Sequence, residues 1–135
     1  MTDLDGIAGD YGGTGTWHQS DGGHGGYAVS LALSRAAGGW HLAYTHVFDN
    51  GDPDTTAAFD LARIAAGPLL AVSAGGQQIG RGYAFGGALH YTLELPGNIV
   101  EATLLADGAG LRVIGSASRN KAGLAIAWEE RLTRA

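Results

Sequence analysis

The sequence contains no cysteine among its 135 residues, and it has only one lysine. The absence of cysteine excludes disulfide bonds, thiolate metal sites and a cysteine nucleophile. The seven arginines are scattered along the chain, and the formal net charge at pH 7 is −5. Because a nucleic-acid-binding protein needs a clustered basic footprint, we expect no nucleic acid among the partners.

Long apolar runs are also missing. No stretch approaches the roughly 18 residues that a membrane-spanning helix needs, so we expect no membrane partner. Residues 1–5 are acidic and lack the apolar segment of a signal peptide. Together these absences predict a soluble, cytoplasmic protein of bacterial type.

Glycine is abundant instead, at 24 of 135 residues, and it marks turns at intervals of roughly 8–14 residues. Alternating apolar segments lie between these turns, which argues against disorder. Evenly spaced short strands with such turns are typical of an all-β sandwich or barrel. The turns lie at about 21–23, 37–39, 50–51, 66–67, 75–76, 86–87, 96–98, 107–108 and 122–123.

We predict a single β-barrel domain over residues 1–135, with residues 1–10 as a short lead-in. No segment shows a helical period longer than two turns, although residues 54–66 fit a helix about as well as a strand. The ten predicted strands span about 11–19, 25–35, 39–49, 56–65, 68–74, 78–85, 87–95, 98–106, 110–119 and 123–133.

Bulky and small side chains alternate along the predicted strands, most clearly over residues 27–34 and 40–48. We expect the bulky face to point inward, because hydrophobic stabilisation scales with buried apolar area. The opposite face carries mainly alanine, serine and threonine, and it is a candidate either for a homodimer surface or for the narrow part of the interior.

The predicted connections are short, which favours antiparallel neighbours and therefore a ten-stranded meander. Closing such a long sheet removes both exposed edges. A barrel of more than about eight strands begins to leave internal room for a ligand. The sequence therefore predicts an antiparallel β-barrel with space inside.

Residues 9–17 have the sequence GDYGGTGTW. This segment resembles the Gly-x-Trp-x-Gly-x-Gly opening of nitrobindin-type barrels, with Tyr11 in place of tryptophan. Its end resembles the Gly-x-Trp opening of lipocalins and other calycins. The resemblance implies a calycin-like barrel in which Trp17 packs beneath Arg131, or Arg134, and closes one end. The strand number also resembles that of nitrobindins and fatty-acid-binding proteins.

The chain departs from these families at functional positions. Nitrobindins hold haem iron with a late histidine, whereas the last histidine here is His90 and the final two predicted strands contain none. Fatty-acid-binding proteins hold a carboxylate with Arg-x-Tyr near the C-terminus, whereas Arg131 is followed by leucine and threonine. We therefore expect no cofactor and no haem site of the nitrobindin kind.

Several bulky and polar residues share the inward parity and form the predicted ligand site. His46, Arg63, Tyr91 and Glu130 could together form a polar cluster among apolar walls, as in a small-molecule site. Alternatively, each is a hydrated group at a barrel mouth or a satisfied core group. The predicted ligand-binding residues are Tyr27, Leu31, Trp40, Leu42, Tyr44, His46, Phe48, Arg63 and Tyr91.

No metal site or catalytic motif is expected. His90 has the opposite parity to His46, His41 is expected outside, and His18 and His24 flank a turn. Residues 49–54 are rich in oxygen ligands, but this composition is that of an ordinary turn, and the glutamate of a calcium loop is missing.

The predicted function is binding of an apolar or amphipathic small molecule inside the barrel. One alternative is a barrel enzyme, an isomerase, cyclase or lyase, with His46 or Glu130 as general base. Another is an oligomeric interaction module with a filled barrel. No residue is assigned a catalytic role from the sequence alone.

Overall fold

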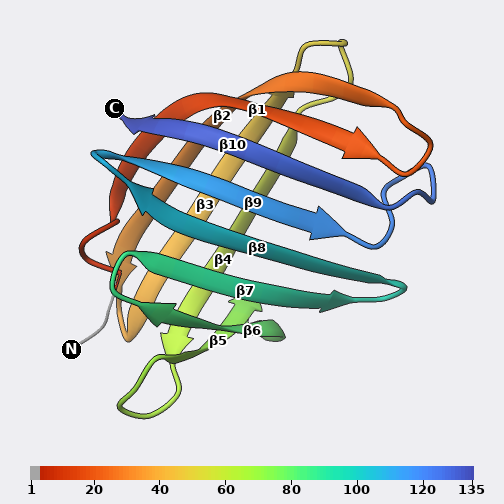
Figure 1. Cartoon of the computed structure of the whole chain (residues 1–135). Helices are drawn as coiled ribbons and strands as arrows, with labels where there is room; N and C mark the ends of the chain where they lie inside the picture. Colours follow the sequence, from red (N-terminus) through yellow and green to blue (C-terminus); the bar gives the residue numbers. More distant parts are fainter. Residues whose placement is uncertain (1–3) are drawn as a thin grey trace.

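The chain forms a closed barrel of ten antiparallel strands, seen in a computed structural model that describes residues 4–135 (Figure 1). Each strand pairs with the next along the chain, and the last closes on the first. This confirms the predicted all-β meander barrel. The strands are β1 (Gly9–Gln19), β2 (His24–Ala36), β3 (Gly39–Phe48), β4 (Thr55–Arg63), β5 (Leu69–Ala74), β6 (Gln77–Phe85), β7 (Ala88–Leu95), β8 (Asn98–Asp107), β9 (Gly110–Ala117) and β10 (Ile126–Arg134).

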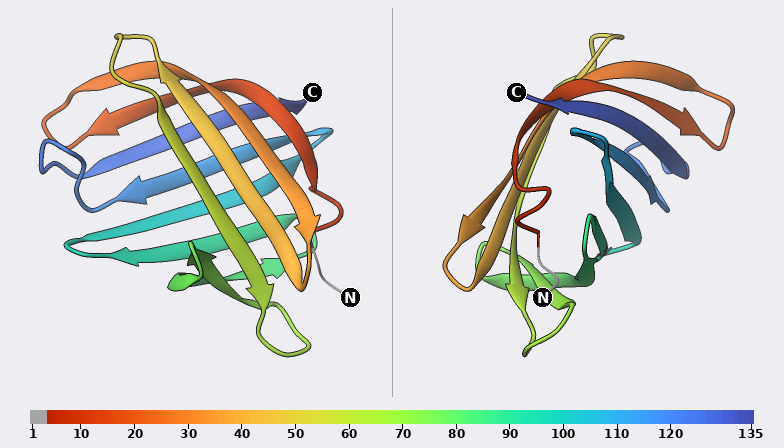
Figure 2. Two further views of the ribbon diagram at one scale, coloured as in Figure 1. Left: turned by 180° about the vertical axis from the view of Figure 1, so that it is seen from behind. Right: turned by 60° about the vertical axis from the view of Figure 1, so that its left-hand side comes forward.

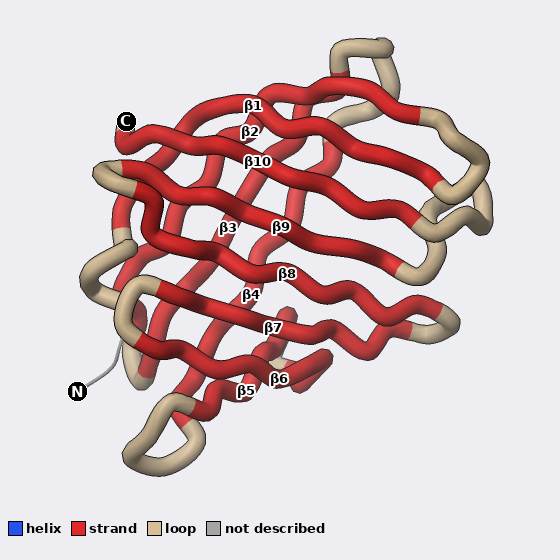
Figure 3. The backbone as a smooth tube through the Cα atoms, in the orientation of Figure 1, coloured by secondary structure: helices blue, strands red, loops and turns tan. Residues whose placement is uncertain are grey.

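Residues 54–66, whose sequence fitted a helix about as well as a strand, contain the strand β4 (Thr55–Arg63). β4 pairs with β3 on one side and with β5 on the other, and only an extended backbone can satisfy both ladders. Figure 3 shows strands and loops over the described part of the chain. Within residues 4–135, no helix is long and apolar enough to cross a membrane.

The bulky side chains point inward, as the alternation predicts. Along β2, Tyr27, Val29, Leu31 and Leu33 are buried, whereas the small residues between them are half-buried or exposed. In Figure 2 the strands β2 to β4 form one wall, which crosses the direction of β7 to β10 on the other side of the core. The predicted small-residue face is therefore the outer surface of the first wall.

The pairing of β5 with β6 departs from a regular ladder. The register shifts between Val72 and Ser73, which marks an irregularity. On β6, a Cβ atom at Gly80 would lie 2.0 Å from the carbonyl oxygen of Thr92. Only glycine permits this close approach of two backbones, which is one of the roles of an isolated glycine in a strand.

The two ends of the barrel are built differently. The closed end holds the start of β1, the end of β10 and the turn formed by residues 4–7, whose Leu4 and Ile7 are buried (0 % and 2 % exposed). The open end holds the β1–β2, β3–β4 and β9–β10 connections. The termini of the described chain lie on the same side in Figure 1.

Polar side chains fasten the N-terminal turn over the closed end. Arg35 Nη2 lies 2.7 Å from Asp5 Oδ2, and Trp40 Nε1 donates a hydrogen bond to Asp5 Oδ1 at 3.4 Å. The Arg63 guanidinium lies 5.3 Å from the centre of the Trp40 ring. Trp40 and Arg63 therefore belong to the closed end, which corrects their assignment to the ligand site.

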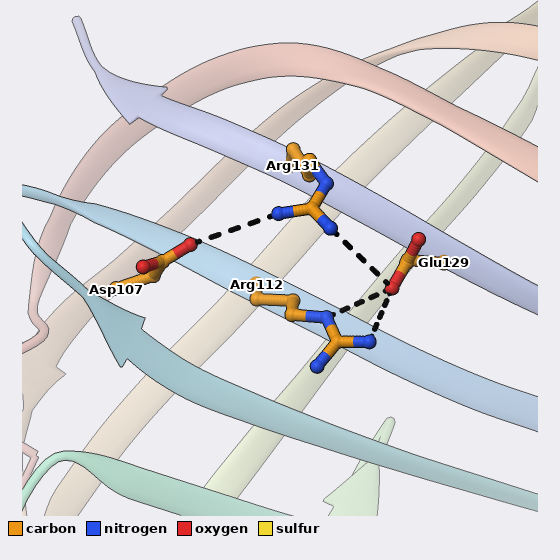
Figure 4. Close-up of polar contacts among 4 residues, drawn as sticks. All are labelled: Asp107, Arg112, Glu129 and Arg131. Carbon is orange, nitrogen blue, oxygen red and sulfur yellow. Dashed lines mark hydrogen bonds and ion pairs between the residues drawn. The ribbon is translucent and has the colours of Figure 1, made fainter.

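The expected closure of the barrel by Arg131 is wrong. The Arg131 side chain is 67 % exposed on the outer surface, 4.0 Å from Asp107 and from Glu129 (Figure 4). Glu129 is held more closely by Arg112 Nε, at 2.8 Å. Arg131 has this position because it alternates with the inward-facing Leu132 along β10.

Arg134, the other residue that the resemblance offered, does lie at the closed end. Its guanidinium donates hydrogen bonds to the carbonyl oxygens of Ala8 and Gly6, at 2.8 and 3.1 Å. It also lies 5.1 Å from the centre of the Tyr11 ring. Its aromatic partner is therefore Tyr11, whereas Trp17 lies toward the open end.

Candidate functional site

A cavity of about 230 Å³ lies inside the open end of the barrel. Six of its nine lining residues are aromatic or imidazole rings, contributed by four strands. This wall is suited to the flat face of a ring system, because aromatic rings pack favourably in tilted and offset arrangements. The lining residues are Trp17, Tyr27, Tyr44, His46, Phe48, Thr55, Val100, Ile126 and Trp128.

Glycines on neighbouring strands make room for three of these rings. A Cβ atom at Gly15 would lie 2.4 Å from the Tyr27 ring, and one at Gly25 would lie 2.8 Å from the Trp17 ring. At Gly115, a Cβ atom would lie 2.5 Å from the Trp128 ring. The rings therefore lie flat against glycine backbone, as in the known pairing of strand glycines with aromatic side chains. This leaves the centre of the open end empty.

A buried carboxylate stands behind the aromatic wall. Glu130 on β10 is 2 % exposed, and its Oε2 accepts a hydrogen bond of 2.7 Å from the Tyr27 hydroxyl. His46 Nε2 on β3 lies 3.1 Å from the same oxygen. The His46 ring is packed between Tyr27 and Tyr44, with ring centres 4.7 and 4.8 Å away. Both partners of the carboxylate are thereby held in place.

The pKa values of three tyrosines around this group are raised above the usual value. Burial, with the Glu130 charge and its hydrogen bond adding to it, raises the pKa of Tyr27 strongly. Burial also raises the pKa of Tyr44 and, further, that of Tyr91. The Tyr44 and Tyr91 side chains also influence each other's pKa. At neutral pH these groups are therefore neutral hydrogen-bond donors and acceptors.

A second void, of about 20 Å³, adjoins the cavity on the side of the closed end. Tyr44, His46 and Trp128 line both spaces. Glu130 and Tyr91 line the void but not the larger cavity. A volume of this size holds one water molecule, provided that polar groups surround it. The site therefore combines an apolar chamber with a small polar recess.

The cavity continues toward solvent through a mouth of about 420 Å³. Trp17, Phe48, Thr55 and Ile126 line both spaces. The mouth adds the charged side chains of Asp52 and Lys121, from the β3–β4 and β9–β10 connections. A molecule bound in the cavity therefore has a path to solvent that passes one acidic and one basic group.

The structure brings together most of the predicted site. Tyr27, Tyr44, His46 and Phe48 line the cavity, and Tyr91 borders the polar recess. Leu31 and Leu42 line the recess as apolar walls. Within the predicted polar cluster, His46, Tyr91 and Glu130 come together, whereas Arg63 lies at the other end.

Some lining residues were not expected in the site. Trp17 was assigned to closing the barrel, and it lines the cavity instead. Trp128 has the bulk of a lining residue, and it shares the inward parity of Glu130, which could have indicated it. Thr55 and Val100 carry no such signal, since their position depends on the register of the closed barrel.

The remaining histidines lie away from the cavity. His90 Nδ1 lies 2.9 Å from Thr103 Oγ1 on the outer surface, and His41 Nδ1 lies 2.9 Å from Asp60 Oδ1. His18 and His24 stack on one another beside the β1–β2 turn. Over the range 4–135, no three histidine or acidic side chains are grouped so as to hold a metal ion.

Comparison with known proteins gives matches at the level of structure. No protein-family model matches the sequence, and no curated protein sequence matches it significantly. One similar structure is the S-type phycobiliprotein lyase CPES from Guillardia theta, with a TM-score of 0.73 and 9 % identity. The alignment covers 98 % of this chain and 90 % of the lyase.

A second similar structure is a protein of unknown function from the DUF3598 family of Nostoc punctiforme, with a TM-score of 0.68 and 11 % identity. The alignment covers 98 % of this chain and 49 % of the Nostoc protein, so this chain spans about half of that protein's length. At such low identities the likeness concerns the fold alone. Together with the ten-stranded meander, it supports the expected antiparallel β-barrel fold.

Proposed function

We propose that the barrel binds an apolar or amphipathic small molecule in the cavity at its open end. The ligand is a flat molecule of one or two fused rings, since about 230 Å³ is below the volume of an ordinary drug-sized pocket. It carries one polar group that meets His46 or Tyr44. The observation that carries this proposal is an aromatic chamber with a buried carboxylate behind its wall.

The composition of the open end supports a binding role over a filled barrel. The closed end is packed with leucines, which stabilise a core without polar atoms. A buried carboxylate with a histidine partner is often no more stabilising than apolar residues of similar volume. Keeping Glu130 and His46 in the interior is therefore better explained by a ligand than by stability.

The structural comparisons support the same proposal at a coarser level. One neighbour is named as a phycobiliprotein lyase, and the other has no known function. A barrel of this shape is compatible with the binding of a small molecule. A linear tetrapyrrole is much longer than two fused rings, so in this chain it would extend from the cavity into the mouth.

The proposal is tested by titrating the protein with 2-naphthol and following tryptophan fluorescence. Trp17 and Trp128 line the cavity, so a bound ring should quench their emission. The variant Gly115→Ala should weaken binding at least about tenfold, because the new methyl group would displace the Trp128 ring. The control Gly12→Ala adds a methyl group with 3.8 Å to the nearest atom, Val29 O, and should bind normally.

Two results would argue against the proposal. The first is an absence of saturable quenching by 2-naphthol and by biliverdin, the larger probe. The second is equal binding by Gly115→Ala and the wild type, which would place the ligand elsewhere. Native mass spectrometry of gently purified protein, followed by denaturation, should release a small apolar compound and show its chemical class.

A further inference from the structure

The Glu130 carboxylate sets the tautomer of His46. A lone pair on His46 Nε2 would be repelled by Glu130 Oε2, which lies 3.1 Å away, so Nε2 carries the hydrogen. In the neutral ring the other nitrogen, Nδ1, then holds a lone pair. Among the described residues Nδ1 has no hydrogen-bond partner. The ring lines the cavity, so this lone pair is left for a bound molecule.

The tyrosine pair supplies a hydrogen-bond donor beside this nitrogen. Tyr44 lines the cavity and also the recess that Tyr91 borders. Tyr91 is 3 % exposed, where an unsatisfied donor would be costly, so its proton is best directed at a group in the recess such as the Tyr44 oxygen. The Tyr44 hydroxyl then keeps its own proton for an acceptor in the cavity.

The rings that carry the donor and the lone pair lie side by side. Tyr44 and His46 are on the same face of β3, and their rings stack with centres 4.8 Å apart. A ligand in the cavity therefore meets a neutral hydroxyl donor and an imidazole base together. This pair of groups suits a carbonyl compound with a C–H bond next to the carbonyl carbon, since the oxygen accepts a hydrogen bond while the base takes the proton.

We propose that this site, beyond binding, transfers protons on a ketone that carries an acidic α C–H bond next to an aromatic or conjugated system. The proposal rests on the binding function above. His46 Nδ1 takes the α proton, and the electron pair of the C–H bond becomes the C=C bond of an enolate. The carbonyl π electrons move to oxygen, which accepts the Tyr44 hydrogen bond.

The second half of the reaction returns the proton. The His46 imidazolium, paired with the Glu130 carboxylate, gives its proton back to the same carbon or to the γ carbon of a conjugated system. The first outcome is exchange, and the second is isomerisation of the double bond. Neither needs an oxidant, a reductant or a metal. His46 and Tyr44 are the catalytic residues, and Glu130 is a positioning residue that fixes the His46 tautomer.

The experiment uses 2-tetralone in deuterated buffer. Loss of the proton NMR signal of its benzylic α hydrogens reports proton removal, and tryptophan quenching reports binding. Tetralin, which has the same rings without the carbonyl group, is the binding control. We expect exchange above the buffer rate, and tighter binding of 2-tetralone than of tetralin. In Tyr44→Phe this difference in affinity should disappear.

The variants separate base, positioning group and background. His46→Gln should lower the exchange rate at least about a hundredfold, in line with the usual contribution of a general base. Glu130→Gln should lower the rate at least about tenfold while 2-tetralone still binds, because only the orientation and charge behind His46 change. His90→Gln, which alters a histidine on the outer surface, should leave the rate unchanged.

Each other outcome has a definite meaning. Binding of 2-tetralone without exchange above the buffer rate overturns proton transfer and leaves the binding function standing. Exchange that persists in His46→Gln overturns the assigned base. Binding of tetralin but not 2-tetralone overturns carbonyl recognition. Binding of neither compound, together with failure of 2-naphthol, removes the binding function itself. Circular dichroism confirms folding, and Tyr44→Phe serves as the test if His46→Gln does not fold.

Discussion

The two ends of this barrel place similar residue types in opposite roles. At the closed end Trp40 is 2 % exposed and held by Asp5 and by two arginine side chains. At the open end Trp17 and Trp128 lie against glycines and border an empty space. A tryptophan surrounded by other side chains therefore fills one end of the barrel, whereas tryptophans that lie flat on glycine backbone leave space at the other end.

The two ends also differ in whether their charged side chains are exposed or buried. At the closed end the charged side chains lie near the surface, where Asp5 and Arg35 are 47 % and 63 % exposed. At the open end Glu130 is inside the barrel, with the Tyr27 hydroxyl as its hydrogen-bond donor and His46 Nε2 at 3.1 Å. Charges that fasten a structure remain in contact with water, whereas the buried carboxylate belongs to the site that we propose for a ligand.

The largest expected effect is the loss of stability when the closed end is hollowed. Leu61→Ala should lower the free energy of unfolding by about 2–5 kcal/mol, because Leu61 is 1 % exposed and its removal leaves a cavity. Phe48→Ala at the open end should cost clearly less, since its ring already borders empty space. Urea unfolding measures both values. Equal losses would contradict the division into a packed end and an open end.

The reverse change should stabilise the open end. Replacing the polar group by apolar residues, with Tyr27→Phe, His46→Leu and Glu130→Leu together, should raise the free energy of unfolding by about 1–4 kcal/mol. The single change His46→Leu should instead lower it by about 3–5 kcal/mol, because the buried carboxylate loses a partner. The triple variant should also lose 2-naphthol binding. A triple variant less stable than the wild type would show that the polar group is needed for folding.

Alkaline pH should act on the open end through its tyrosines. Burial raises the pKa of Tyr27, Tyr44 and Tyr91 above the ordinary value of 10.0. The folded state then favours the protonated form, so the stability that these groups contribute is present below pH 10 and is lost as the pH rises above it. Phenolate absorbance should show three tyrosines ionising late or only on unfolding. In Tyr27→Phe the number should fall to two.

The smallest effect is expected at Arg131. Its contacts are 4.0 Å long on an exposed surface, so Arg131→Ala should change the free energy of unfolding by no more than about 0.5 kcal/mol. Arg134→Ala should cost about 1 kcal/mol or more, because its guanidinium holds two carbonyl oxygens of the N-terminal turn. Thermal unfolding of both variants gives the comparison. A larger loss for Arg131→Ala would restore it as a closing residue.

The alternation of side chains predicted the faces of the strands correctly. It placed His46 inside and His90 outside, and it grouped Glu130 with His46 before any pairing was known. Alternation has a period of two, so it fixes the side of a sheet on which a residue lies. Most of the predicted cavity wall depends on this property, whereas the barrel itself was predicted from the spacing of the turns and the short connections.

Depth along the barrel axis could not be predicted in the same way. Trp40 and Tyr44 have the same parity, yet Trp40 lies at the closed end and Tyr44 at the cavity. Their separation depends on strand tilt and register, which arise only when β10 closes on β1. The error at Arg131 has another origin. The alternation along β10 already placed it outside, and a short motif resemblance was given more weight.

The glycines behind the aromatic wall have a consequence for how such a barrel changes over generations. A glycine codon becomes an alanine codon by a single base substitution, and at Gly15, Gly25 or Gly115 that change would place a methyl group where a ring now lies. The ring would move toward the barrel axis, and the internal volume would shrink while the strand pairing stayed intact. Descendants of this chain could therefore alter the size of molecule they accept one nucleotide at a time, without altering any residue that touches the ligand's polar group.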